Sequence, residues 1–444
     1  MKDNQEKKKI NFLKKSISDK VFDSIKTKMP TISQTEQDAI DAGDTWIEAD
    51  IFKGDIDWDY ILESNIDNLN QKELDFIEKK VKPLLKKINN YKILKDNDMP
   101  KTIWDYLKKE KFFSMIIPEE YGGLGFSSLG NSTVVSMLAS VSSTLAVSVM
   151  VPNSLGPAEL LLKYGTEEQK NNWLPNLAKG KEIPCFGLTS PSAGSDAGSL
   201  LDRGVVVEKE IDGKRVVGIN LNFSKRYITL APVATVMGLA FKLFDPDGLI
   251  GTKKEYGITV ALIPTNTPGV DNNYRHQPMN LSFMNGTLEG KDVFIPLTSI
   301  IGGQDNAGKG WRMLVECLSA GRGISLPALS GAISQNNVRI ATSYSLIREQ
   351  FGTSIYNFEG IQESLANIIG LNHIINSTRR MTNKALDIGK HPSVITAITK
   401  YHTTEMARES VKETMDILGG KAIIQGKLNP TTDAYFGMPV AITV

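Results

Sequence analysis

Cysteine and histidine are scarce in this 444-residue chain, and its charges nearly cancel. The two cysteines, Cys185 and Cys317, exclude a disulfide framework and suit a reducing cytoplasm. The four histidines show none of the spacings that are typical of metal ligands. A formal net charge of +1 gives no general basis for binding nucleic acid. The composition therefore indicates an ordinary cytoplasmic protein, long enough for about two or three domains.

Long hydrophobic runs and a secretory leader are missing as well. The most apolar stretch covers residues 134–151 and carries no charge, but six serines and threonines interrupt it and Pro152 follows it. This pattern predicts a helix in the protein interior rather than a membrane span.

Residues 1–30 hold nine lysines against four acidic residues. Apolar residues recur in this segment at helical spacing, namely Ile10, Leu13, Ile17, Val21 and Ile25. Two interpretations fit such a basic amphipathic segment. One is peripheral contact with an anionic membrane, and the other is a helix packed on the protein or a solvated tail.

The remaining chain divides into three regions by its periodicity. Residues 31–183 read as a helical N-terminal domain, residues 184–303 as a compact β-domain, and residues 304–444 as a helical bundle. Within the β-domain, Asp212-Gly213 between two valine-rich runs predicts a hairpin. The fold class expected from this order is α+β.

Two segments of the β-domain suggest a ligand site. The run from Phe186 to Gly198 is rich in glycine and serine, which let a backbone approach a ligand closely and present N–H groups to it. About thirty residues later, Tyr227 and Thr229 stand two apart in a strand-like segment. They would place an aromatic ring and a hydroxyl on one face of an extended chain, suited to a planar ring system.

These segments resemble the flavin site of the acyl-CoA dehydrogenase family. Four further motifs occur in the family's order, at Pro118–Gly125, Tyr164–Lys170, Arg348–Gly352 and Asp416–Gly420. The chain looks most similar to the bacterial long-chain fatty acyl-CoA dehydrogenases of β-oxidation. The resemblance implies FAD as cofactor, α,β-dehydrogenation of an acyl-CoA, and electron-transfer flavoprotein as the electron acceptor.

The resemblance also implies roles for single residues. Leu188 and Thr189 would bond the polar edge of the flavin, Tyr227 would flank the ring, and Thr229 would donate to its N5 atom. Other cofactor contacts would come from Phe186, Ile228 and Ser195. Ser195 is also a substrate-binding candidate, together with Arg322, which would lie at the substrate end of the cavity.

A second group of motif residues would contact FAD held by a neighbouring subunit, which implies a homo-oligomer. The group consists of Arg348, Phe351, Asp416, Gly419 and Gly420. The chain departs from the family here, because Asp416 replaces a usual glutamine and Ala422 a usual glycine.

The catalytic base is the remaining expectation. By the resemblance, the general-base glutamate would come immediately after Val444, and the alternative position, directly before Arg322, holds Gly321, which cannot ionise. The sequence therefore leaves two hypotheses, an acyl-CoA dehydrogenase and a truncated, inactive fragment that binds FAD or acyl-CoA. A Walker-like run at Gly303–Gly310 lacks the Ser or Thr that would hold Mg²⁺, and we expect a simple loop there.

Overall fold

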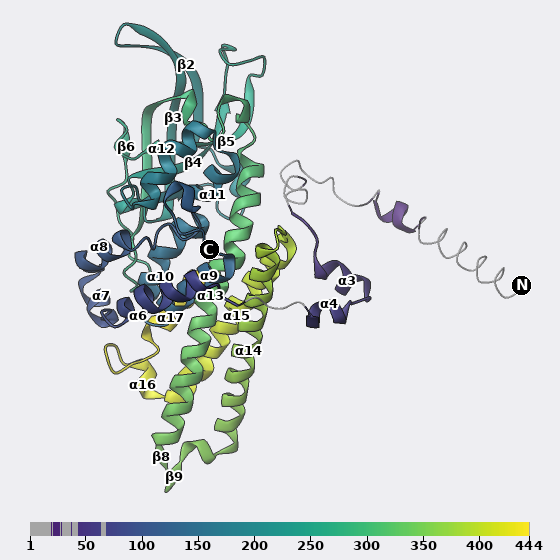
Figure 1. Ribbon diagram of the computed structural model, residues 1–444, viewed down its shortest axis with the longest axis vertical. Helices are drawn as coiled ribbons and strands as arrows, with labels where there is room; N and C mark the ends of the chain where they lie inside the picture. Colours follow the sequence, from purple (N-terminus) through teal and green to yellow (C-terminus); the bar gives the residue numbers. More distant parts are fainter. Residues whose placement is uncertain are drawn as a thin grey trace, which may run out of the picture.

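The computed structural model describes residues 19, 21–26, 28, 37, 43–63 and 68–443. They form helices first, then a mixed seven-stranded sheet, then a long helical bundle (Figure 1). This order confirms the predicted α+β class. The basic segment 1–30 lies mostly outside the described residues, and of its apolar positions Val21 and Ile25 are described and exposed.

Short helices make up the part before the sheet. Their bounds are α3 Ile47–Lys53, α4 Trp58–Glu63, α5 Gln71–Phe76, α6 Lys82–Leu85, α7 Asn90–Asp96, α8 Lys101–Lys109, α9 Ser128–Ala139, α10 Ser143–Met150, α11 Pro157–Tyr164 and α12 Glu167–Ala178. Two π-helical turns, η1 Ile77–Val81 and η3 Val151–Leu155, continue α5 and α10. Helix α5 begins at a capping box, in which Asn70 and Glu73 each accept a hydrogen bond from the other's N–H at 3.0 Å.

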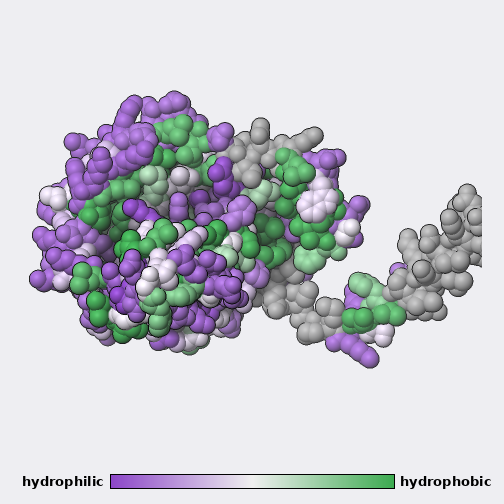
Figure 2. Space-filling model, turned by 90° about the horizontal axis from the view of Figure 1, so that it is seen from below, coloured by the Kyte–Doolittle hydropathy of each residue, from purple (hydrophilic) through white to green (hydrophobic). Residues whose placement is uncertain are grey.

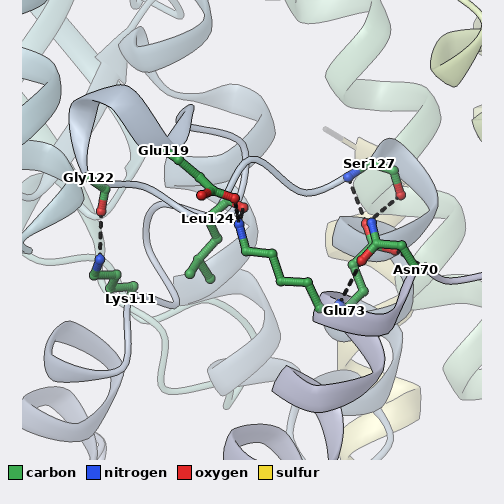
Figure 3. Close-up of polar contacts among 8 residues, drawn as sticks. Asn70, Glu73, Lys111, Glu119, Gly122, Leu124 and Ser127 are labelled. Atoms are coloured by element: carbon green, nitrogen blue, oxygen red, sulfur yellow. Dashed lines mark hydrogen bonds and ion pairs between the residues drawn. The ribbon is translucent and has the colours of Figure 1, made fainter.

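The Pro118–Gly125 motif is a loop held by polar contacts (Figure 3). The Lys72 ammonium donates to the Glu119 carboxylate and to the Leu124 carbonyl, and Lys111 Nζ donates to the Gly122 carbonyl at 2.8 Å. Beside it, Glu73 accepts hydrogen bonds from the N–H and hydroxyl of Ser127, which caps α9. These contacts fix the entry to α9.

The single helix predicted over residues 134–151 is wrong in one respect. Helices α9 and α10 are separate, and the turn between them ends at Ser142, whose hydroxyl accepts from Leu145 N–H at 3.3 Å and so caps α10. Both helices are largely buried. In the described part of the chain, one helical run, Ser143–Tyr164, is long and apolar enough to cross a membrane, and 88% of its most apolar window is buried inside the protein.

The sheet follows α12. Its strands are β1 Pro184–Gly187, β2 Arg203–Ile211, β3 Lys214–Thr229, β4 Val236–Phe244, β5 Glu255–Pro264, β6 Val270–Asp271 and β7 Asn285–Pro296. Their order is β1-β4-β2-β3-β7-β6, with β5 paired to β4. Strands β2 and β3 form the predicted hairpin, and Asp212 and Gly213 at its turn have φ of 51° and 73°.

The bundle is built on one long helix. Helix α13 runs from Gly310 to Ile347 without a break, although Pro327 lies inside it. Its glycines serve close packing: a Cβ on Gly323 would lie 2.6 Å from the Thr396 side chain. The other elements are β8 Glu349–Gln350, β9 Thr353–Ser354, α14 Glu359–Asp387, α15 Ser393–Leu418, α16 Gly420–Ile423 and α17 Thr432–Thr443. The Gly303–Gly310 run is the connection from β7 to α13, as expected.

Candidate functional site

The ends of β1 and β3 bring the first predicted group together. We call residues 188–198, which follow β1, the glycine–serine loop. Its Thr189 carbonyl accepts a hydrogen bond from Arg226 N–H at 3.1 Å. The loop therefore lies beside the end of β3, where Tyr227 and Thr229 are found.

A bulge at the end of β3 corrects the predicted geometry. The register with β7 shifts between Lys225 and Ile228, and Tyr227 has a left-handed φ of 61° rather than an extended one. A bulky residue in this conformation is strained, and such strain is often found at functional sites. The Tyr227 side chain is 60% exposed, so its ring is accessible to a planar ligand.

Asn285 on β7 supports the bulge. Its amide Nδ2 donates to the Tyr227 carbonyl at 3.0 Å and to Thr229 Oγ1 at 3.4 Å. Because Thr229 Oγ1 accepts this bond, its own hydrogen remains available for donation to a ligand. Ile228 is buried, so its backbone rather than its side chain can reach a ligand.

Unpaired polar groups gather around the glycine–serine loop. The N–H groups of Leu188 and Thr189 donate to no acceptor among the described residues. Ser190 Oγ, Arg226 Nε and His276 Nε2 are buried without a hydrogen-bond partner there. Leaving such a group unpaired costs about 1–3 kcal/mol, so the cluster indicates a polar ligand at the loop.

Phe186 on β1 and Ser195 in the loop are the other two cofactor contacts predicted in this part of the chain. The Phe186 ring covers Gly238 of β4, where a Cβ would come within 2.6 Å of it, so the ring is part of the sheet's packing. Ser195 is exposed in the glycine–serine loop. The His276 ring lies 5.3 Å from that of Tyr227 and extends the site by a residue that the sequence did not single out.

Arg322 lies on α13 beside the end of α17. It is exposed, although partial desolvation lowers the pKa of its guanidinium. Burial and the nearby Arg322 both lower the pKa of Lys400 on α15, whose Nζ donates to the Ile442 carbonyl at 2.6 Å. At Gly321, directly before Arg322, no side chain fits, because a Cβ there would lie 1.7 Å from the Ser154 carbonyl oxygen.

A carboxyl group that sequence reasoning missed lies on α11. Burial raises the pKa of Glu159 to about 8, against the opposing effect of Lys163. Burial would also raise the pKa of Glu316 on α13, but hydrogen bonds from Arg312, Lys163 and Tyr164 hold it at about 2. The Lys163 and Arg312 contacts measure 2.6 and 2.8 Å. Two neighbouring glutamates are therefore held in opposite protonation states at neutral pH.

The second predicted group lies at the far end of the bundle, which we call the tip. Arg348, Phe351, Asp416, Gly419 and Gly420 are all exposed. Ile417 and Ala341 belong to one buried apolar cluster, and the Lys421 ammonium lies 5.6 Å from the centre of the Tyr344 ring, which brings the two motifs to the same end. The sheet is at the opposite end of α13, which has 38 residues and is about 57 Å long at 1.5 Å per residue (Figure 1).

A cavity of about 620 Å³ lies apart from both groups. It is bounded by α7, the α9–α10 turn, α13 and the loop before α17, and no residue of the glycine–serine loop lines it. Its lining mixes asparagine and lysine with apolar side chains. Asn90 Oδ1 and Asn337 Oδ1 in this lining are also buried without a hydrogen-bond partner among the described residues, but no motif residue lines the cavity. The candidate site is therefore the glycine–serine loop with the end of β3, where the motif residues lie.

Comparison with known proteins decides the family. Models of the N-terminal and C-terminal domains of acyl-CoA dehydrogenase match residues 67–181 and 308–436, which together exceed half of the chain. The chain belongs to the acyl-CoA dehydrogenase family. Members of this family are FAD-dependent oxidoreductases that act on CH–CH bonds.

Curated relatives are similar to different lengths of the chain. The human mitochondrial very long-chain specific acyl-CoA dehydrogenase is 27% identical over 381 residues, which are 84% of this chain and 56% of that protein. A protein named HemX from Proteus mirabilis is 59% identical over 91 residues, 20% of this chain and 54% of that one. The chain thus spans about half the length of these two curated relatives.

The fold is that of solved acyl-CoA dehydrogenases. Butyryl-CoA dehydrogenase from Megasphaera elsdenii superimposes with a TM-score of 0.73 at 23% identity, and the match covers 84% of this chain and 94% of that one. At this identity the likeness supports the fold alone.

Proposed function

We propose that this chain binds FAD and dehydrogenates long-chain fatty acyl-CoA thioesters to trans-2-enoyl-CoA, within fatty acid β-oxidation. The observation that carries the proposal is the glycine–serine loop. Its open Leu188 and Thr189 N–H groups and the buried unpaired Ser190 hydroxyl lie beside the exposed Tyr227 ring. These groups fit a planar heteroaromatic cofactor with polar edge atoms.

Each residue at the loop has a binding role in this proposal. Leu188 and Thr189 would hold the polar edge of the ring system, Tyr227 would cover its face, and Thr229 would donate its free hydroxyl hydrogen. FAD, when bound, supplies the acceptor for the β-hydride. The residues of this chain would bind and orient the ring.

Arg322 and Lys400 support a substrate end on α13. Two cations near the end of α17 would stabilise a thioester oxygen as it gains negative charge. Similarity to a relative named for very long chains supports long-chain acyl groups as substrates.

We further propose a homo-oligomer in which the tip of one subunit completes the FAD site of another, and electron-transfer flavoprotein as acceptor. The exposed tip residues support the first part, because they lie at the opposite end of α13 from their own chain's loop. Figure 2, viewed from below, shows hydrophobic residues in patches between hydrophilic ones. Exposed apolar residues of the tip include Leu346, Ile347, Phe351 and Ile423.

The test is the visible spectrum of the purified chain, followed by anaerobic addition of palmitoyl-CoA or butyryl-CoA. A yellow protein that is bleached at a lower concentration of palmitoyl-CoA than of butyryl-CoA supports the proposal, including its preference for long acyl chains. A yellow protein that neither substrate bleaches supports the second candidate, a chain that binds FAD without dehydrogenation. A colourless protein that takes up no added FAD contradicts both.

A further inference from the structure

Two adjacent residues of β3 hold the glycine–serine loop from opposite sides. Because side chains alternate along a strand, Lys225 points into the core and Arg226 away from it. Lys225 is fully buried, whereas Arg226 is half-buried. Both contact carbonyl oxygens of the loop.

Lys225 makes the buried contact. Its Nζ lies 3.0 Å from the Leu188 carbonyl oxygen and 2.5 Å from Oδ2 of Asp202, which is also buried. The other oxygen of Asp202 accepts from Ser224 N–H at 2.9 Å. A buried ion pair is often no more stabilising than apolar side chains of similar volume, so fold stability alone is a weak reason for this pair.

Arg226 makes the outer contacts. Its main-chain N–H donates to Thr189 O, and its Nη2 donates to Pro191 O at 3.1 Å. Its guanidinium lies 5.1 Å from the centre of the Tyr227 ring. The carbonyls of residues 188, 189 and 191 are thus all turned toward β3.

The planarity of the peptide bond gives these contacts a consequence. In a trans peptide, the N–H of one residue points opposite to the carbonyl of the residue before it. When Lys225 holds the Leu188 carbonyl toward the core, the Thr189 N–H must point away from the core. That N–H is one of the two that have no acceptor among the described residues.

We propose that Lys225, fixed by Asp202, and Arg226 are positioning residues that keep the loop's N–H groups directed at the cofactor. This inference rests on the proposed function, because FAD is the ligand it assigns to those groups. It adds three residues to the site that none of the family motifs above singled out.

The test separates positioning from stability by a double variant of the full chain. K225M alone leaves Asp202 buried and unpaired, so both stability and FAD affinity should fall. K225M/D202N removes both charges and retains an acceptor for Ser224 N–H. We expect the double variant to regain most of the wild-type urea midpoint but to bind FAD about tenfold or more weakly in a fluorescence titration. R226Q should weaken FAD binding by a smaller factor.

Hydrogen–deuterium exchange of the apoprotein gives a readout that does not need FAD. Amides of residues 188–198 should exchange faster in K225M/D202N than in the wild type, while the rest of the sheet is unchanged. K209M is the matched control, because Lys209 on β2 is exposed and contacts Asn220. Wild-type FAD affinity and loop exchange in the double variant would overturn the inference. If wild-type protein binds no FAD, the proposed function fails, and the exchange data still decide whether Lys225 orders the loop.

Discussion

The end of β3 and the tip of the bundle carry motif residues of one family but differ in how the chain surrounds them. At β3, the bulge at Tyr227 is supported by Asn285, and the loop beside it is held by Lys225. At the tip, Phe351 is 96% exposed and also has a left-handed φ, of 54°. The first region is organised by contacts within the chain, whereas the second presents strained and apolar groups to its surroundings.

This difference suggests a simple criterion. Substitutions near β3 and α13 should change the free energy of unfolding of the single chain. Substitutions at the tip should leave that free energy nearly unchanged and affect association or cofactor binding. The four predictions below test this separation in order of decreasing effect on stability.

The largest effect is expected for G321A. Its new Cβ would lie 1.7 Å from the Ser154 carbonyl oxygen, so either α13 or the π-helical turn η3 must move. Overpacking of this kind should lower the free energy of unfolding by about 3 kcal/mol or more. Urea denaturation followed by circular dichroism measures it, and a loss below about 1 kcal/mol would show that α13 and η3 are less closely packed.

A smaller, pH-dependent effect is expected for E159Q. Because its pKa is raised from 4.5 to about 8, folded Glu159 holds its proton where the unfolded chain has lost it. The wild-type free energy of unfolding therefore falls as pH rises from about 4.5 to about 8. E159Q removes this pH dependence and should be more stable than wild type by a few kcal/mol at pH 8, with little difference at pH 4.5. Urea denaturation of both proteins at the two pH values measures the difference.

E316Q is the matched control for E159Q. The pKa of Glu316 is depressed to about 2, so its contribution to stability is present above pH 4.5 and is lost as pH falls through about 2. E316Q should therefore destabilise the protein at neutral pH, opposite in sign to E159Q. Equal effects of the two variants would refute the assigned protonation states.

Local signals in the sequence predicted several elements correctly because their causes are local. The turn at Asp212-Gly213 depends on residues within a few positions. The continuity of α13 could not be predicted in this way, because close packing against Thr396 compensates for its glycines. The hydrophobic pattern alone predicts one helix from residue 134 onward, because it does not account for Ser142, which caps the N-terminus of α10.

The candidate site shows the same limit. The glycine–serine loop and the ring of Tyr227 were visible as motifs, but the bulge that turns Tyr227 outward depends on Asn285, 58 residues away. The pairing of Lys225 with Asp202 spans 23 residues and has no periodic signal. The raised pKa of Glu159 comes from burial, which a single sequence does not give.

At the tip, F351G should change stability little. Glycine accepts the left-handed φ of 54° without strain, and the lost side chain is almost fully exposed, so the free energy of unfolding should shift by less than about 1 kcal/mol. Self-association, measured by analytical ultracentrifugation, should weaken. M279G is the control, because Met279 is also exposed with a left-handed φ, of 41°, but lies in the β-domain. Equal association of F351G and wild type would remove Phe351 from the proposed contact.

The smallest effect on stability, within a few tenths of a kcal/mol, is expected for G420A. Nothing lies within 4 Å of a Cβ at Gly420, which begins α16, and alanine is favourable in a helix. Any functional effect must then come from outside the chain. If a second subunit's cofactor approaches the tip, the added methyl group should weaken FAD binding or association, whereas G370A, which is equally open but lies further along α14, away from the tip, should leave both unchanged. G321A and G420A are the same chemical change at a packed and at an open position. If G420A is stable and keeps wild-type assembly and FAD affinity, the tip is merely an exposed surface, and the loop beside β3 binds its cofactor without it.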